Sequence, residues 1–228
     1  MKIPVLVPNI FDHPFTYETD MELKLGEYVL VPFGKSKMTG VVWDHFEKNQ
    51  KKNFLIKKIF KKLNVQPLNK KTIKFMNWFS EYNLIPKGMS LKLHLLSSEA
   101  IENFQKKEYE FYNKLIDHEK ITLTKDQQKV SEELLQKSDK FRVHLLQGTT
   151  GSGKTIVYFN AIKKKIDLGY QGLILLPEIG LTSEFEKKFI EYFGFNPAIW
   201  HSGVSKKRKK VIWSGLASKK IKVVIGAR

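Results

Sequence analysis

A glycine-rich segment at residues 145–155, LLQGTTGSGKT, constrains the fold of this chain more than any other stretch. It fills the pattern G-x-x-x-x-G-K-[ST] with Gly148, Gly153, Lys154 and Thr155. Glycines at these places let backbone N–H groups turn toward the β-phosphate of a nucleoside triphosphate, and the lysine reaches the β- and γ-oxygens. The threonine hydroxyl is expected to be a ligand of the Mg²⁺ ion that bridges those oxygens. The segment predicts a phosphate-binding loop with Lys154 and Thr155 in the catalytic roles; its candidate nucleotide-binding residues are Gly148, Thr149, Thr150, Gly151, Ser152, Gly153, Lys154 and Thr155.

The sequence around this loop favours a parallel sheet with crossover helices. The run FRVHLL at 141–146 predicts a short strand before the loop, and apolar residues at helical spacing over 155–166 predict a helix after it. From residue 123 onward, helix and strand patterns alternate, as they do in α/β folds. The predicted elements are a helix over 125–138 with Thr124 as its N-cap, strands at 172–176, near Ala198 and at 221–225, and helices over 181–193 and from Ser205.

Composition and charge narrow the class of protein. Of the 228 residues 42% are hydrophobic, which is enough for a core, and the absence of cysteine excludes disulfides and thiolate metal sites in this chain. The formal charge of +17 indicates either a polyanionic partner such as nucleic acid or a bias in codon usage, since only Arg142, Arg208 and Arg228 are arginines. No apolar window is long enough to span a membrane, and the first residues do not form a signal sequence. We therefore expect a cytoplasmic protein without membrane association.

Residues 1–96 have the pattern of a β-rich domain. Short apolar runs at 3–7, 28–33 and 40–43 alternate with turn residues. The later segment KFMNWFSEYNLI has the three- and four-residue spacing of one amphipathic helix. Its aromatic side chains are expected to lie in the core rather than to stack on bases; they are Phe75, Trp78, Phe79 and Tyr82.

Two lysine-rich stretches leave two interpretations open. Residues 48–62 have apolar residues between their lysines, as in a strand or hairpin edge with one wet, positive face. Residues 206–210, KKRKK, place consecutive basic residues at the start of a predicted helix. Each stretch is either a solvated surface or a contact for the phosphates of nucleic acid.

Several weaker signals follow from the expected α/β architecture. Ligands of open α/β sheets bind beyond the carboxyl ends of the strands, so LLPEIGLT at 175–182, HSG at 201–203 and GAR at 226–228 should lie on the same rim as the phosphate-binding loop. His201 alone is more typical of a capping residue than of a catalyst, and the other histidines lack metal-ligand spacing. Gln127 precedes the loop at the start of the first predicted helix, and its amide can donate to and accept from the edge of an adenine.

Taken together, these motifs resemble those of superfamily 2 helicases, and specifically of the primosomal protein N′ (PriA) family of bacterial replication-restart helicases. LTKDQ at 123–127 is similar to the family's adenine-recognising glutamine motif, QGTTGSGKT to motif I, LLPEIGLT to motif Ia, and HSG with VVIGAR to the motif Ib region. The resemblance implies a RecA-like lobe that binds ATP and Mg²⁺, with Gln127 as a nucleotide-binding residue. It also implies DNA contacts at the rim by Pro177, Glu178, Gly180 and Arg228.

The amino-terminal region resembles the family's domain for the 3′ end of the nascent leading strand. The segment VPFGKSKMTGVVW carries the similarity there. Residues 15–17 fall on a Phe-Asp-Tyr motif of the 3′-end pocket, with a threonine in place of the aspartate. The DNA-binding residues that the resemblance implies are Phe15, Thr16, Tyr17, Gly34, Lys35 and Lys57.

Two departures from the family shape the expected domain organisation. Members usually carry a winged helix after the first domain, and residues 97–122 are too short for one. The family's DExH box, cysteine-rich zinc insertion and second RecA-like lobe would lie beyond Arg228, so zinc is expected only there. The predicted fold class is therefore α/β: a β-rich DNA-binding domain (1–96), a linker with a short helix (97–122), and a truncated first RecA-like P-loop lobe with a parallel sheet (123–228).

The resemblance implies an ATP-dependent 3′ to 5′ DNA helicase that supports primosome assembly at stalled forks. From this fragment we expect weak nucleotide binding and little turnover. The implied partners are forked and single-stranded DNA, other primosome proteins and single-strand-binding protein, and the implied location is the bacterial nucleoid within the cytoplasm. Two alternatives stay open: another superfamily 2 DNA translocase, and a non-catalytic DNA-end-binding module with a vestigial phosphate-binding loop.

Overall fold

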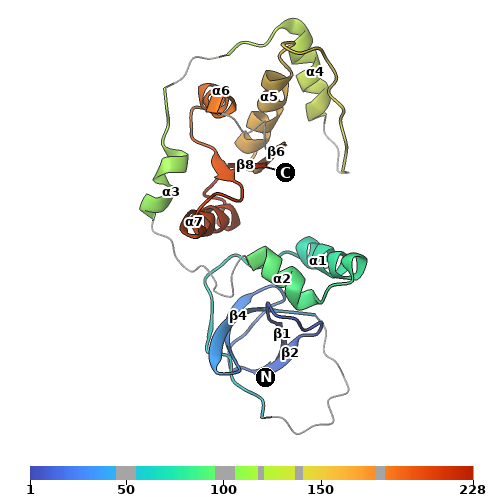
Figure 1. The fold of residues 1–228 in the computed structure, drawn as a ribbon, viewed down its shortest axis with the longest axis vertical. Helices are drawn as coiled ribbons and strands as arrows, with labels where there is room; N and C mark the ends of the chain where they lie inside the picture. The colour runs from blue at the N-terminus through green and yellow to red at the C-terminus, as the bar shows by residue number, and fades with distance from the viewer. Residues whose placement is uncertain (45–54, 96–105, 118–120, 137–140, 178–182, 228) are drawn as a thin grey trace. The chain divides into compact units, whose positions relative to one another are not determined.

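The computed structural model describes residues 1–44, 55–95, 106–117, 121–136, 141–177 and 183–227. They form two compact units, Met1–Asn103 and Phe104–Arg228 (Figure 1). No helix among the described residues is long and apolar enough to cross a membrane.

The first unit is built on an antiparallel sheet of five strands in the order β2-β1-β4-β3-β5. Their bounds are Lys2–Leu6 (β1), Phe15–Glu18 (β2), Tyr28–Phe33 (β3), Ser36–Val42 (β4) and Lys61–Lys62 (β5). Alternate side chains of a strand point to one face, and here that face buries Val5, Val29 and Val31 completely. The hairpin between β3 and β4 has a two-residue turn, in which Gly34 has a φ of +60°.

Two helices complete this unit, α1 (Lys70–Asn83) and α2 (Lys87–Leu95). The Asn69 side chain caps α1 by accepting from the Thr72 N–H, and Leu84, with a φ of +53°, ends it. The helix buries Ile73, Met76 and Ser80.

The prediction that the aromatic residues of α1 lie in the core is wrong. The side chains of Phe75, Trp78 and Tyr82 are 56%, 52% and 73% exposed, and Phe79 is half-buried. The physical reason is that the opposite face of the helix carries the small Ser80, whose hydroxyl lies 2.6 Å from the buried Ser90 hydroxyl of α2. A small side chain at this contact lets the two helices approach closely, so the aromatic face is left outside.

The second unit contains a parallel sheet of three strands in the order β6-β8-β7. The strands are Gly172–Leu176 (β6), Ala198–Trp200 (β7) and Val223–Ala227 (β8). The helices are Lys106–Asn113 (α3), Lys125–Leu135 (α4), Lys154–Asp167 (α5), Ser183–Phe193 (α6) and Lys206–Ala217 (α7). A β-rich antiparallel unit followed by a parallel α/β unit confirms the predicted fold class.

Helices cover both faces of this parallel sheet. Helices α5 and α6 cover one face through a cluster that includes Phe159, Phe189 and Phe193. Helices α3 and α7 cover the other face, where Tyr109, Tyr112 and Ile212 are buried. The short helix predicted within 97–122 therefore packs as part of the second unit, and the Tyr109 hydroxyl lies 2.9 Å from that of Ser214 in α7.

The strand predicted at 141–146 does not form. Residues 141–149 form neither helix nor strand, and Phe141, Val143 and Leu145 are 92%, 81% and 90% exposed. A run of β-prone residues becomes a strand only where a neighbour accepts and donates its hydrogen bonds. In the described sheet β8 is paired on both sides, but β6 is paired with β8 alone; residues 141–146 do not use the open edge of β6, so their backbone has no strand partner.

Candidate nucleotide and DNA sites

The phosphate-binding loop lies directly before α5, whose first residue is Lys154. Gly151 and Gly153 have φ angles of +85° and +81°, in the left-handed region that side chains rarely adopt. The Lys154 Nζ donates to the carbonyl oxygens of Gly148 and Thr149, each at 2.7 Å. The ammonium group is thus held inside the loop, at the positive N-terminal end of the helix dipole.

Gln127 reaches this loop from α4. Its side chain forms a capping box with Thr124: its Oε1 accepts from the Thr124 N–H at 3.1 Å, and the Thr124 hydroxyl accepts from the Gln127 N–H at 3.3 Å. The Gln127 Nε2 donates to the Ser152 carbonyl oxygen at 3.3 Å. It also lies where a side chain on Gly153 would begin, 2.3 Å from an ideal Cβ position. The structure therefore places the predicted glutamine against the phosphate-binding loop, and its contact with adenine stays a prediction.

A chain of hydrogen bonds fastens α4, α5 and α6 together. The Asn160 Nδ2 on α5 donates to the Ser131 hydroxyl on α4 at 2.8 Å, and the Tyr192 hydroxyl on α6 donates to the Asn160 Oδ1 at 3.2 Å. Ser131 is completely buried. This link could not be predicted from the sequence, because single polar residues are common on helices of any kind.

A pocket of about 530 Å³ opens beside the loop, a size typical of small-molecule sites. Its lining combines the loop with the flank of α6: Ile121, Thr150, Gly151, Ser152, Gly153, Lys154, Thr155, Ile156, Phe159, Lys188, Glu191 and Tyr192.

The Lys188 Nζ pairs with the Glu184 carboxylate at 2.7 Å, and this pair raises the pKa of Lys188 and lowers that of Glu184. Burial raises the pKa of Tyr158, one helical turn after Thr155, although a hydrogen bond with the Thr155 side chain opposes it. The pocket offers an ammonium group, backbone amides and a hydroxyl, the donor set that a nucleotide triphosphate with Mg²⁺ requires.

In the first unit, Phe15 lies in a cluster of aromatic rings with Phe11, His13 and Phe33, which we call the β2 aromatic cluster. The ring centroids of Phe15 are 5.1 Å from both Phe11 and His13, and 5.4 Å from Phe33. The predicted Phe15 is therefore one wall of a larger group. Phe11, His13 and Phe33 were missed from the sequence, although the close spacing of rings in FDHPF was a usable signal.

The other predicted residues of this region divide into buried and exposed ones. Tyr17 is only 4% exposed, its hydroxyl donates to the Pro32 carbonyl oxygen at 3.1 Å, and burial raises its pKa to about 12. Thr16 is half-buried on the same strand. Lys35 and Lys57 are exposed, and the Lys57 Nζ donates to the Gly34 carbonyl oxygen at 3.3 Å, which holds this lysine at the β3–β4 turn.

The predicted rim of the parallel sheet is described only in part. Pro177 follows the end of β6, whereas Glu178, Gly180 and Arg228 lie outside the described residues. The His201 Nδ1 accepts from the Gly203 N–H at 3.2 Å within the turn that follows β7, whereas the N-cap of α7 is Ser205.

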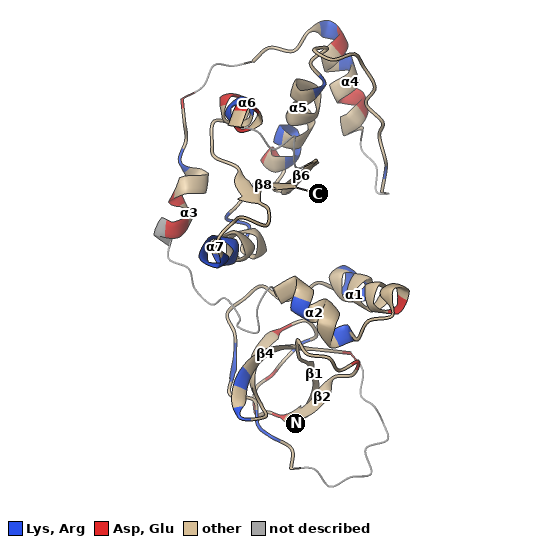
Figure 2. Ribbon diagram, viewed as in Figure 1, with Lys and Arg blue, Asp and Glu red and all other residues tan. Residues whose placement is uncertain are grey.

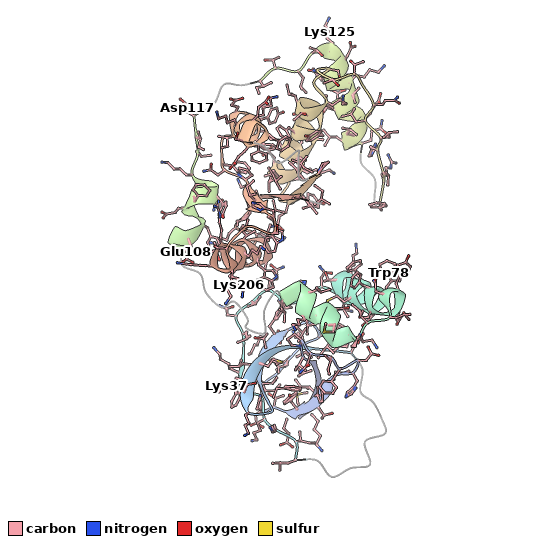
Figure 3. All side chains as sticks on the ribbon, in the orientation of Figure 1. Lys37, Trp78, Glu108, Asp117, Lys125 and Lys206 are labelled. Atoms are coloured by element: carbon pink, nitrogen blue, oxygen red, sulfur yellow. The ribbon has the colours of Figure 1, made fainter. Side chains whose placement is uncertain are left out.

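The basic run at the start of α7 is partly engaged within the protein, and Figure 2 shows its Lys and Arg gathered there. The Arg208 Nε donates to the Tyr112 hydroxyl at 3.2 Å, and the Lys209 Nζ donates to the Ser202 carbonyl oxygen at 3.3 Å. Lys206 and Lys207 are exposed, and Lys206 is labelled in Figure 3.

Comparison with known protein families matches both units. A model of the PriA 3′ DNA-binding domain matches residues 4–95, and a model of DEAD/DEAH box helicases matches residues 124–228.

Individual relatives point in the same direction. The replication restart protein PriA of Rickettsia conorii is 35% identical over 227 residues, which cover 100% of this chain and 34% of that protein. PriA of Bacillus subtilis is 38% identical over 112 residues, 48% of this chain and 14% of its own length. PriA of Helicobacter pylori is 38% identical over 94 residues, 41% of this chain and 15% of its own length. The chain thus spans about a third of the length of this and other Rickettsia relatives that it matches from end to end. The two family models in this order, with similarity to PriA along the whole chain, show that the chain combines regions similar to a PriA 3′ DNA-binding domain and to a DEAD/DEAH box helicase, and that it is similar to PriA proteins.

Proposed function

We propose that this chain is the DNA-binding and ATP-binding part of an ATP-dependent 3′ to 5′ DNA helicase that acts in replication restart. The observation that carries the proposal is the phosphate-binding loop, in which Lys154 is held by two loop carbonyls and Gln127 contacts the same loop from α4. The family matches supply the biological setting, since the curated relatives are named replication restart proteins.

ATP would bind with its phosphates on this loop. Lys154 would exchange its bonds to the carbonyls of Gly148 and Thr149 for bonds to the β- and γ-phosphate oxygens, and the first N–H groups of α5 would donate to the β-phosphate. Thr155 would hold Mg²⁺, whose charge offsets that of the phosphate oxygens. We assign nucleotide binding to Gln127 and to residues 148–155, with Lys154 and Thr155 acting directly on the phosphates and the metal.

The first unit would bind the DNA end. Phe15 and its neighbouring rings offer stacking surfaces for a base, and Lys35 and Lys57 offer charge to the adjacent phosphates. Tyr17 would not contact DNA, because its side chain is buried and its hydroxyl already donates a hydrogen bond to the Pro32 carbonyl oxygen. It would instead stabilise the strand that carries Phe15. Pro177, Glu178, Gly180 and Arg228 remain candidates for contact with single-stranded DNA at the rim of the second unit. Other primosome proteins and single-strand-binding protein remain proposed partners.

The decisive experiment compares nucleotide and DNA binding in one variant. Lys154→Ala should weaken binding of a fluorescent ATP analogue at least tenfold, because no other side chain of the loop carries a charge to the phosphates, and it should leave the affinity for forked DNA unchanged. Lys164→Ala, which removes an exposed lysine from the same helix, is the matched control and should alter neither. A parallel loss of ATP and DNA binding in Lys154→Ala would count against two separate sites.

The non-catalytic alternative makes a different prediction. A DNA-end-binding module with a vestigial loop would bind forked DNA and show no Mg²⁺-dependent binding of the ATP analogue. Nucleotide binding that requires both Mg²⁺ and Lys154 therefore excludes that alternative.

A further inference from the structure

Three aromatic side chains form an exposed row along α1, which we call the α1 stripe: Phe75, Trp78 and Tyr82. They are spaced three and four residues apart, so they share one face of the helix. The Trp78 and Tyr82 rings stack, with centroids 5.2 Å apart and planes at 23°, and the Phe75 and Trp78 centroids are 5.8 Å apart. Figure 3 labels Trp78 on this helix. Large aromatic rings that adjoin one another on a surface mark an interaction site more often than isolated ones.

The stripe is not part of the core of the first unit. Helix α1 buries its other face, Ile73, Met76 and Ser80, and the completely buried Ile73 anchors it. Removing a ring from the stripe therefore leaves the packing of the helix in place. From Phe75 to Tyr82 the stripe extends for about 10 Å along the helix axis, which is enough to meet two or three stacked bases.

The charges on the N-terminal side of the stripe are positive. Lys71 lies one turn before Phe75, and Lys74 one turn before Trp78, so both share the aromatic side of the helix; both side chains are exposed. Among the helix residues, Glu81 is the only acid. Figure 2 shows the lysines of α1 toward its start. Rings in line with lysines are the composition that single-stranded nucleic acid requires, since bases stack on the rings and the phosphates meet the cations.

The segment that follows α1 is joined by hydrogen bonds to the segment that carries part of the β2 aromatic cluster. The backbone N–H of Gly88 donates to the Phe11 carbonyl oxygen at 3.0 Å, and that of Lys87 donates to the Asp12 carboxylate at 2.9 Å. The start of α2, just after the turn that ends α1, is thus fastened to the loop that carries Phe11 and His13. The stripe and the cluster therefore belong to connected segments of the same unit.

We propose that the α1 stripe is a second contact for single-stranded DNA, on which bases stack a few nucleotides away from the 3′ end. This inference rests on the proposed DNA binding of the first unit. An apolar face of a partner protein is a less suitable occupant. It would remove water from the charged groups of Lys71 and Lys74 without offering them a partner, which costs free energy.

The test uses the 228-residue chain with both of its units. The double variant Trp78→Ala with Tyr82→Ala should bind fluorescein-labelled oligothymidine at least tenfold more weakly, because each lost stacking contact costs binding free energy. Trp78→Phe with Tyr82→Phe keeps two rings and should retain most of the affinity. Tyr170→Ala removes a 63% exposed tyrosine from the second unit and should change nothing. Oligothymidine should also quench the tryptophan fluorescence of the wild type and much less that of the double alanine variant.

The outcomes separate this inference from the proposed function. Suppose that the wild-type protein binds oligothymidine with either a 3′ hydroxyl or a 3′ phosphate, and that the double alanine variant, with native circular dichroism, binds both as tightly as the wild type. The stripe is then not a DNA contact, and this inference fails while the proposed function stands. That result would indicate a protein-docking surface instead. If the wild type binds no oligonucleotide at all, the DNA-binding part of the proposed function fails as well.

Discussion

At the scale of single residues, the phosphate-binding loop is held from two sides by side chains that the sequence singled out. Lys154 closes the loop on its own carbonyls, and Gln127 packs against Gly153 while donating to the Ser152 carbonyl. Two independent reasons favour glycine at position 153. Its φ of +81° is rarely adopted by other residues, and the Gln127 amide occupies the space of a Cβ atom. Backbone strain and steric conflict with Gln127 both oppose a larger residue at this position. A matched pair of substitutions can separate the two effects.

Gly153→Ala should therefore lower ATP-analogue affinity at least tenfold. The new Cβ must displace Gln127 or shift the loop, in addition to a strain of about 1–2 kcal/mol from the left-handed backbone. Gly169→Ala is the control: its φ is +85°, but no atom lies within 4 Å of the added Cβ. It should lower the melting temperature and leave nucleotide affinity unchanged, as measured by titration and thermal unfolding. Equal losses of affinity in both variants would show that contact with Gln127 is unimportant.

At the scale of helices and strands, α2 contacts the sheet of the first unit through the half-buried His94 and the buried Tyr28. The His94 Nε2 lies 3.0 Å from the Tyr28 hydroxyl of β3. Burial lowers the pKa of His94, so the folded state favours the neutral imidazole. A lowered pKa contributes stability that is complete above the unfolded value of about 6.5 and is lost as the pH falls through the folded value.

We accordingly expect the first unit to lose stability when the pH is lowered from 7 to 5, and His94→Gln to lose less. Glutamine keeps a polar side chain near Tyr28 but does not titrate. Urea unfolding at each pH, followed by the fluorescence of the buried Trp43, measures this difference. Identical pH dependence in the two proteins would mean that other groups dominate.

The same scale shows how far the sequence predicts this fold. Helices α4 and α7 are capped by Thr124 and Ser205. The Thr124 cap was predicted because a hydroxyl at that position satisfies a free N–H, whereas Ser205 was predicted only as the start of its helix. The sequence did not predict which face of α1 is exposed to solvent. Both of its faces carry large apolar residues, so periodicity identifies a helix without saying which side packs; the small Ser80 decides it. The strand at 141–146 failed for a related reason, since pairing depends on a neighbour and not on the run itself.

The candidate sites were predictable to a similar degree. A phosphate-binding loop is local in sequence, so all its residues were found together. The β2 aromatic cluster joins Phe33 to residues 11–15 across strands, and the Ser131–Asn160–Tyr192 link joins three helices. Contacts between distant segments depend on tertiary packing, which composition and spacing do not encode.

At the scale of the whole molecule, the charge of +17 should make DNA binding depend steeply on salt. Part of that charge is committed to internal contacts, as with Arg208 and Lys209, and part is exposed, as with Lys206 and Lys207. Only lysines that neutralise phosphates release counterions on binding, so salt dependence separates binding lysines from merely solvated ones.

We expect the logarithm of oligothymidine affinity to fall linearly with the logarithm of salt concentration. Lys71→Gln, beside the α1 stripe, should reduce the slope by about 0.7, the value for one phosphate of a single strand. Lys206→Gln with Lys207→Gln tests the start of α7 in the same titration. An unchanged slope there would show that this basic run is solvated and has no phosphate contact.

The hydrogen-bonded link from Ser131 through Asn160 to Tyr192 couples the positions of helices α4 and α6 in the second unit. It joins α4, which carries Gln127, to α6, which follows residues 178–182 of the predicted DNA rim in the sequence. A movement of α4 on nucleotide binding would therefore be transmitted to α6 through two bonds rather than absorbed between loosely packed helices. Thermodynamic reciprocity then requires that DNA held at the rim change nucleotide affinity by the same factor by which nucleotide changes DNA affinity. Asn160 would be the joint at which that coupling can be cut without touching either ligand.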